Sequence, residues 1–241
     1  SGPDVYQKRM WRVVENGDDH VTFLLHSPDG DQGYPGALDM KVTYTLDEEN
    51  GLTIHYEAVP DQDTVINMTN HSYFNLNGHK SGSVLHHRMQ LLSDAFTPAD
   101  AQSIPTGEVC SVDGTPMDFR STKELGAEID AAYEPLILGN GYDHNWVLKN
   151  EGRFDKVAEV TGDESGIVME VWTDRPGVQV YTANFLENEA GRNGAVYQKR
   201  DAVCLETQNY PDAVHQKNFP EAICKKGETY DTKTAYRFHI E

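Results

Sequence analysis

Two titratable side chains, Glu206 and His71, have the types and the sequence settings that proton transfer requires. Glu206 lies in the run AVCLETQNYPDAV, where it alternates with Val203 and Leu205. A strand over this run would turn the carboxylate away from the face that carries the aliphatic pair. The pattern alone favours a solvated or salt-bridged acid as much as a functional one. The other polar strand faces therefore decide how Glu206 is interpreted.

The run VINMTNHSYFNL predicts a strand with one face that is polar or amphipathic throughout. Alternation places Asn67, Thr69, His71, Tyr73 and Asn75 on that face. A solvated face more usually carries Lys, Glu and Thr, so this set indicates a ligand-binding surface. His71 taken alone would more often be a structural histidine than a catalytic one.

Two further runs carry side chains that suit a sugar. In GVQVYTANF, Gln179 and Tyr181 share a strand face with Phe185. An amide can pair with hydroxyls and a ring can pack on C–H groups, although the two could also form an ordinary cross-strand pair. In NGYDHNWVL, a glycine-containing turn precedes Asp143, which could cap that turn or hold vicinal hydroxyls.

The elements that must position these residues are predicted to be strands, because short runs rich in Val, Thr, Tyr and Leu are separated by Gly, Pro and Asp turns. Helix is expected only at 125–132. This pattern predicts an all-β fold, a sandwich or barrel, that forms one domain over 1–241. The expected strands are 21–27, 40–46, 51–59, 64–76, 84–92, 157–160, 168–172, 178–185, 202–209 and 229–240.

Charge and cysteine usage narrow the range of partners. The 241 residues hold 39 acids against 20 Lys and Arg, a net charge of −19, and the acids are dispersed. Such a field disfavours nucleic acid and anionic membrane surfaces as partners. No apolar run approaches the roughly 20 residues of a membrane helix. Cys110, Cys204 and Cys224 lack metal-type spacing, so we expect no metal site and a reducing, cytoplasmic location.

Four runs in this order carry a family resemblance: NMTNHSYFNL, GYDHNWVL, PGVQVYTANF and CLETQNYPDAV. Together with GDQGYPGAL and IPTGEV they resemble the aldose 1-epimerase (galactose mutarotase) family, from about Tyr6 to the C-terminus. The resemblance implies a large antiparallel β-sandwich of the galactose mutarotase-like supersandwich type, with very little helix.

The resemblance also implies an activity and residue roles. Family members interconvert the α and β anomers of free aldohexoses such as galactose and glucose, without a cofactor or a metal. Glu206 is then the general base at the C1 hydroxyl, and His71 is the general acid at the ring oxygen. Asp143 and Gln179 would hold sugar hydroxyls. Tyr181 and Asn67 complete the expected substrate-binding set.

The chain departs from the family pattern at its start. In the family, the segment that resembles SGPDVYQKRMW follows a Leu-His whose imidazole belongs to the active site, and an Asn-Arg pair lies further upstream. Neither is present here. We therefore expect an N-terminally incomplete sandwich, whose partner is the missing segment or a second copy of the chain.

Three alternative functions remain open from the residues. A glycoside hydrolase could use Glu206 and Asp143 as its two carboxylates. A non-catalytic carbohydrate-binding module would keep Tyr181, Gln179 and Asp143 while tolerating the loss of Glu206. An epimerase of phosphorylated hexoses should show Arg or Lys in these motifs, which have almost none.

Overall fold

The structure, a computed structural model, describes residues 4–241, and strands make up nearly all of its regular structure. The single α-helix among these residues is α1 (Glu134–Leu138). Residues 4–241 also contain four 3-10 turns: η1 (Tyr6–Lys8), which precedes the first strand, and η2 (Asp31–Gly33), η3 (Arg192–Gly194) and η4 (Ala213–His215) between strands. The strands are β1 (Arg12–Asn16), β2 (His20–Ser27), β3 (Leu38–Leu46), β4 (Gly51–Pro60), β5 (Thr64–Val65), β6 (Arg88–Leu91), β7 (Ala95–Thr97), β8 (Cys110–Ser111), β9 (Lys123–Glu124), β10 (Asp143–Val147), β11 (Asp155–Thr161), β12 (Ile167–Thr173), β13 (Gly177–Tyr181), β14 (Glu189–Ala190), β15 (Val196–Tyr197), β16 (Cys204–Gln208), β17 (Ile223–Cys224) and β18 (Tyr230–Ile240).

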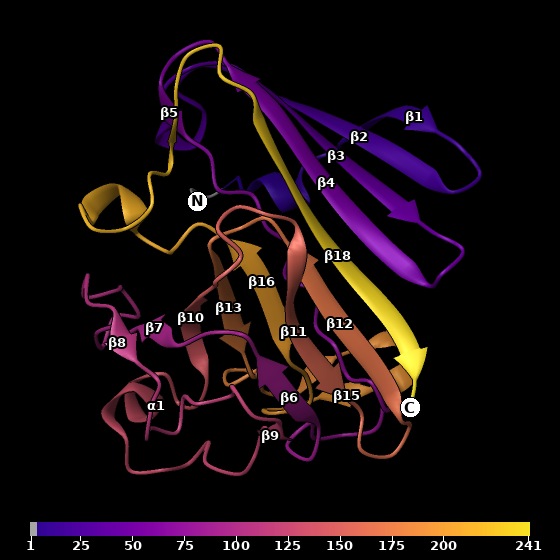
Figure 1. Ribbon diagram of the computed structural model, residues 1–241. Coiled ribbons are helices and arrows are strands. Elements are labelled where there is room, and N and C mark those ends of the chain that lie inside the picture. Colours follow the sequence, from indigo (N-terminus) through magenta and orange to yellow (C-terminus); the bar gives the residue numbers. More distant parts are fainter. Residues whose placement is uncertain (1–3) are drawn as a thin grey trace.

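Two large antiparallel sheets form the sandwich. The larger sheet has the order β1-β2-β3-β4-β18-β12-β11-β6-β9, and the smaller has the order β16-β13-β10-β7-β8. In Figure 1 the strands β18, β12 and β11 lie in front of β16, β13 and β10, while β1, β2 and β3 project away from the smaller sheet. One continuous core of buried side chains draws on both sheets. The predicted all-β antiparallel sandwich with little helix is confirmed.

Strand β18 joins the two halves of the larger sheet. Its residues pair with β4 along one edge and with β12 along the other. Tyr236 of β18 and Trp146 of β10 are almost fully buried, so the strand packs directly over the smaller sheet. Burial of such large side chains contributes about 1.5–3 kcal/mol each, so this overlap stabilises the sandwich.

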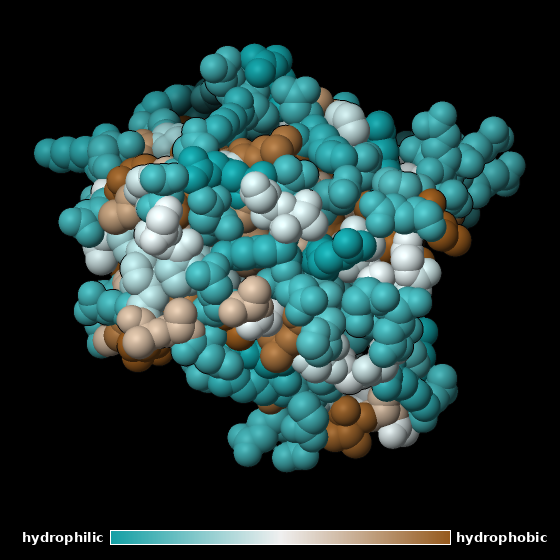
Figure 2. Space-filling view, turned by 60° about the horizontal axis from the view of Figure 1, so that its bottom comes forward, coloured by the Kyte–Doolittle hydropathy of each residue, from teal (hydrophilic) through white to brown (hydrophobic). Residues whose placement is uncertain are grey.

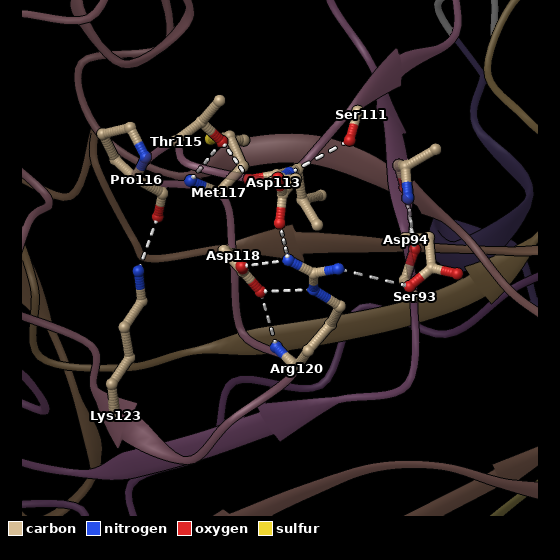
Figure 3. Close-up of polar contacts among 12 residues, drawn as sticks. Ser93, Asp94, Ser111, Asp113, Thr115, Pro116, Met117, Asp118, Arg120 and Lys123 are labelled. Atoms are coloured by element: carbon tan, nitrogen blue, oxygen red, sulfur yellow. Dashed lines mark hydrogen bonds and ion pairs between the residues drawn. The ribbon is translucent and has the colours of Figure 1, made fainter.

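A long excursion between β7 and β10 is fixed by one arginine. Arg120 donates to both carboxylate oxygens of Asp118, at 2.9 and 2.6 Å, and to Asp113 at 2.5 Å. Figure 3 shows the guanidinium held between these carboxylates, with Asp94 on its other side. The same excursion accepts a hydrogen bond from the indole N–H of Trp146 at the carbonyl of Met117. The segment between β7 and β10 therefore helps to fix β10 through the side chain of Trp146.

The helix predicted over 125–132 does not form, and this prediction was wrong. The backbone N–H of Leu125 donates to the carbonyl of His87, and that of Gly126 donates to the carbonyl of Leu85. These long-range bonds replace the local bonds that begin a helix. The segment is instead a series of turns, and the short α1 follows it with Pro135 in its first turn.

The continuous strand predicted over 64–76 is also wrong. Only Thr64–Val65 is a strand, and Phe74 forms an isolated bridge with Val203. Tyrosine hydroxyl groups of β18 bond to this segment and to β16, where a continuous strand would form backbone hydrogen bonds. The hydroxyl of Tyr230 accepts from the Met68 N–H at 3.1 Å, while that of Tyr236 lies 3.0 Å from the Asn70 side-chain oxygen and 2.9 Å from the Leu205 carbonyl.

The surface is mainly hydrophilic. Figure 2 shows small, separated hydrophobic patches on a largely hydrophilic face, as expected for the high content of acids. No helix within residues 4–241 is long and apolar enough to cross a bilayer. A groove of about 640 Å³ runs along β2, β3 and β4, with aromatic walls that include Trp11, Phe23 and Tyr44. The expected pairing of the sandwich with a missing segment or a second copy stays a prediction.

Candidate active site

Glu206 and His71 lie next to each other in the wall of a pocket of about 410 Å³ on the smaller sheet. The Nε2 atom of His71 lies 3.5 Å from Oε1 of Glu206. The imidazole is half exposed, whereas the Glu206 side chain retains 12% of its accessible surface. The pocket is lined by His71, Tyr73, Asp143, Gln179, Tyr181, Phe185, Glu206, Gln208 and Pro211.

Strand β16 orients Glu206 as its local sequence predicts. Val203 and Leu205 are almost completely buried in the core, and Glu206 points to the opposite face. Register pairs Glu206 with Gln179 on β13, so the two side chains stand next to each other. Since β16 is the last strand of its sheet, its free side is open to the segment that carries His71.

Asp143 and Gln179 form a connected polar pair in the same pocket. The Gln179 amide Nε2 donates to Oδ1 of Asp143 at 2.8 Å. Asp143 begins β10, and Gln179 lies at the centre of β13. The bond orients one carboxylate oxygen and leaves the other oxygen and the amide oxygen for a ligand. The structure thus brings these two residues together with Glu206 and His71.

Burial shifts the pKa of both carboxyl groups upward. Removal from water, followed by repulsion from Asp143, raises the pKa of Glu206 to about 8. The pKa of Asp143 is also raised by burial, although the Gln179 hydrogen bond and His71 oppose the shift. Two buried carboxylates near one another disfavour simultaneous ionisation. Perturbed acids in a cleft are a common property of catalytic sites.

Aromatic side chains form one wall of the pocket. The rings of His71 and Tyr73 stack with centroids 4.9 Å apart, and Tyr181 meets both rings edge-on. The Tyr181 hydroxyl accepts from the backbone N–H of Phe185 at 3.1 Å, which fixes the turn after β13. Phe185 stacks on Tyr181 and is largely exposed at the rim.

Four lining residues were not predicted as site residues. Tyr73 and Phe185 lie on the strand faces that the alternation had already marked, and Gln208 shares a face with Glu206. The signal for these three was therefore present in the sequence. Pro211 follows β16 in an irregular turn, and its sequence gave no indication.

Asn67 lies outside the pocket. Its amide Nδ2 donates to the carbonyl of Asn209 at 3.1 Å, and its Oδ1 accepts from the Asn209 N–H at 2.9 Å. The side chain thereby pairs with the residue directly after β16 much as a neighbouring peptide group would. It lines the groove near β3 and β4 instead. Its expected contact with sugar stays a prediction, and its observed role is to attach the His71 segment.

The turn that delivers Asp143 is held by a buried arginine. Arg200 is 6% exposed and donates to the carbonyl of Asn140, to the hydroxyl of Thr182 and to the side-chain oxygen of Asn184. Gly141 approaches the guanidinium so closely that a Cβ there would overlap it, and its φ of +129° also favours glycine. The segments before β10, after β13 and before β16 thus meet at one side chain.

Three further histidines and one cysteine, residue types that are often catalytic or metal-binding, have structural roles here. His144 points into the core, and burial lowers its pKa to about 4. His86 and His87 bind different carboxylates, Glu124 and Asp163, and the described residues hold no cluster of metal-ligating side chains. Cys204 is fully buried, and burial raises the pKa of its thiol.

A sequence model of a known family matches nearly the whole chain. The matching family is described as aldose 1-epimerase, and the match covers residues 4–237. The chain belongs to the aldose 1-epimerase family. The resemblance drawn from the four sequence runs is thereby confirmed, and all four runs lie within the matched residues of this epimerase family chain.

Curated relatives extend the match. Galactose mutarotase of Homo sapiens is 45% identical over 238 residues, covering 98% of this chain and 67% of the human protein. Aldose 1-epimerase of Escherichia coli (strain K12) is 37% identical over 243 residues, covering all of this chain and 70% of that protein. The epimerase chain thus spans about two thirds of the length of these relatives.

Solved structures of related proteins have the same fold. An aldose epimerase homologue from C. elegans superposes with a TM-score of 0.90 at 29% identity, covering 99% of this chain and 71% of that chain. Galactose 1-epimerase from Lactobacillus acidophilus superposes with a TM-score of 0.81 at 27% identity, covering 95% of this chain and 66% of that chain.

Proposed function

We propose that this chain catalyses the interconversion of the α and β anomers of free aldohexoses, with galactose and glucose as substrates. The observation that carries the proposal is the 3.5 Å separation between His71 Nε2 and Glu206 Oε1. Anomer exchange removes a proton from the C1 hydroxyl and delivers one to the ring oxygen. Because both oxygens are bonded to the same carbon, the two proton-transfer groups must lie side by side, as this pair does.

The reaction then runs through the open-chain sugar. Glu206 takes the proton of the C1 hydroxyl while His71 gives a proton to the ring oxygen, and the bond between C1 and the ring oxygen breaks. Rotation about the C1–C2 bond presents the other face of the aldehyde. Closure with the two proton roles reversed yields the other anomer. Each positioned transfer contributes typically about 10²- to 10⁴-fold in rate.

The raised pKa of Glu206 makes its ionised form a stronger base than an ordinary glutamate. Burial and the neighbouring Asp143 raise this pKa to about 8. A base whose pKa lies close to neutral pH takes up the C1 hydroxyl proton at lower cost than a glutamate with its reference pKa would.

The remaining lining residues suit an unphosphorylated sugar. Asp143 and Gln179 offer oxygens to hydroxyl groups, and the rings of Tyr73 and Tyr181 offer faces or edges to C–H groups. No lysine or arginine lines the pocket in the described part of the chain, which counts against a phosphorylated substrate.

The three cysteines form no disulfide in residues 4–241, which fits the proposed cytoplasmic location.

The alternatives are less well supported. In a two-carboxylate hydrolase, Asp143 would act opposite Glu206, yet Asp143 lies two strands away on β10 and is bonded to Gln179. A pure binding module would not need a histidine in contact with a buried, pKa-shifted acid.

Polarimetry of freshly dissolved α-galactose tests the proposal. We expect the protein to accelerate mutarotation above buffer, and Glu206→Gln or His71→Asn to lower kcat by about 10²- to 10⁴-fold. Glu57→Gln, which changes a partly exposed acid on β4 outside the pocket, is the control and should keep the full rate. A wild-type rate equal to buffer would exclude the enzymatic function, and an undiminished Glu206→Gln rate would exclude Glu206 as the base.

A further inference from the structure

The free edge of β16 is attached at both ends to a neighbouring segment of the chain. Directly before β16, Val203 exchanges two backbone hydrogen bonds of 2.9 Å with Phe74. Directly after β16, the backbone of Asn209 is bonded to the side chain of Asn67. Because alternate residues of an edge strand direct their backbone groups away from the paired strand, Leu205 also faces this free edge. Leu205 is buried, so its carbonyl group needs a hydrogen-bond partner there.

That partner is the hydroxyl group of Tyr236, which lies on β18 in the other sheet. The hydroxyl oxygen is 2.9 Å from the carbonyl oxygen of Leu205 and 3.0 Å from the side-chain oxygen of Asn70. Leu205 directly precedes Glu206 in the sequence, and Asn70 directly precedes His71. One hydroxyl group therefore lies between the two residues that adjoin the proposed base and the proposed acid.

We propose that Tyr236 is a positioning residue for anomer exchange, whose hydroxyl group fixes the spacing between Glu206 and His71. The inference rests on the proposed function, because this spacing matters only if both side chains transfer protons with one sugar. Their contact of 3.5 Å is longer than a normal hydrogen bond, so it does not fix the pair by itself. The spacing depends instead on the two chain segments that carry them.

The chemistry of the hydroxyl group suits a bridge between two chain segments. Tyr236 is 1% exposed, and burial raises the pKa of its hydroxyl, so the group keeps its hydrogen throughout the assay range. A hydroxyl group donates one hydrogen bond and can accept others. The Nδ2 atom of Asn70 is a buried donor without a partner in the described part of the chain. With this amide turned by 180°, Nδ2 donates to the hydroxyl, and the hydroxyl donates to the carbonyl of Leu205.

Packing holds the ring of Tyr236 in place. Its backbone is paired on both sides, with Leu52 of β4 and with Val171 of β12. Its ring packs on that of Phe74, with centroids 4.8 Å apart. The hydroxyl is thus presented by a central strand of the larger sheet and not by a loop, as precise positioning requires.

Polarimetry of Tyr236→Phe, which removes the hydroxyl group and keeps the ring, tests the inference. We expect kcat for galactose to fall about tenfold, because the acid and the base lose their common contact. The KM should stay within about twofold of wild type, since Asp143 and Gln179 lie on β10 and β13 and do not depend on this hydroxyl.

Tyr230→Phe is the matched control. It removes another buried hydroxyl group from β18, one that bonds to Met68 of the same segment but not to β16. Both tyrosine variants should lower Tm by a similar amount, about 2–4 °C, because each loses one buried hydrogen bond. Only Tyr236→Phe should lose kcat. Equal losses of kcat in the two variants, a Tyr236→Phe kcat within twofold of wild type, or a change in KM alone would overturn the inference.

Asn70→Ala removes the same contact from its other end and serves if Tyr236→Phe does not fold. We expect it to lower kcat about as much as Tyr236→Phe does. The double variant should lose no more than either single variant, since both substitutions break one link. Losses that multiply in the double variant would show two independent effects and would contradict a shared positioning role.

Hydrogen exchange separates the inference from the function on which it rests. A wild-type rate equal to that of buffer would contradict the proposed function, and the exchange rates would then decide the inference. We expect the amide hydrogens of 70–72 to exchange about fivefold faster in Tyr236→Phe than in wild type, and less than about twofold faster in Tyr230→Phe. Equal exchange in wild type and Tyr236→Phe, measured by NMR, would overturn the inference whether or not the protein is active.

Discussion

The guanidinium of Arg200 donates a 2.9 Å hydrogen bond to the carbonyl of Asn140, three residues before Asp143. The same group donates to Thr182, directly after Tyr181, and Arg200 itself lies four residues before Cys204 and β16. One buried cation thus connects the three segments that present the carboxylates and the aromatic wall. Its nearest carboxylate partner is Asp130 at 3.6 Å, a largely exposed side chain.

We expect Arg200→Met to destabilise the protein by about 2–4 kcal/mol, because the carbonyl and hydroxyl groups around the guanidinium would lose their buried donor. The rate of mutarotation should fall as well, since the turn that carries Asp143 would be released. Urea denaturation and polarimetry measure the two effects. Arg153→Met, which removes an exposed arginine from a surface turn, is the control. Equal stability of the two variants would contradict the role assigned to Arg200.

The pH dependence of the rate should reflect Glu206. The carboxyl acts as a base only when ionised, and its pKa is raised to about 8, so kcat/KM should rise with pH up to about 8. An ordinary glutamate would already be ionised at pH 6. Asp143→Asn removes a neighbouring charge and should move this rise to lower pH, whatever its effect on the maximum rate. The check is polarimetry between pH 5 and 9 with buffer catalysis subtracted, and a flat profile above pH 6 would count against the shift.

Glu206 should also lower the stability of the fold at alkaline pH. Its folded-state pKa of about 8 exceeds the reference value of 4.5, so the folded state binds the proton more tightly than the unfolded state does. Stability from this group is present at low pH and is lost as the pH rises towards 8. Glu206→Gln should therefore be more stable than wild type by about 1–3 kcal/mol at pH 8.5, and close to it at pH 4.5. Thermal denaturation at the two pH values measures the difference.

Strands whose pattern is local could be predicted closely from the sequence. The expected 21–27 and 51–59 became β2 (His20–Ser27) and β4 (Gly51–Pro60). The flanking turns contain enough information in these cases, because each strand is bounded by Gly, Pro or Asp residues. The same local logic placed Val203 and Leu205 in the core and Glu206 opposite them.

Predictions failed where distant residues supply the hydrogen bonds. The segment 64–76 has a strand-like composition, yet the hydroxyls of Tyr230 and Tyr236 bond to the Met68 N–H and to the Asn70 side chain within it. Arg200 was not predicted to matter, because its importance depends on three segments meeting around it. Likewise, alternation places Asn67 on the polar face of a predicted strand, but only the fold shows that its amide pairs with Asn209. The spacing of residues along the chain cannot indicate such distant hydrogen-bond partners.

The attachment of the His71 segment has a consequence for motion. The segment is fixed to the chain of β16 at Phe74 by a backbone bridge and at Asn67 by a side chain, and residues 68–73 between them lie outside any strand. We expect the amide hydrogens of 69–73 to exchange with solvent by local opening, well before those of β13 and β16. Exchange followed by mass spectrometry or NMR measures this order, and equal protection of the two regions would contradict it. Local opening of this kind would move the proposed acid His71 away from Glu206 while both sheets stay closed, and access of a sugar to the pocket would then depend on this segment.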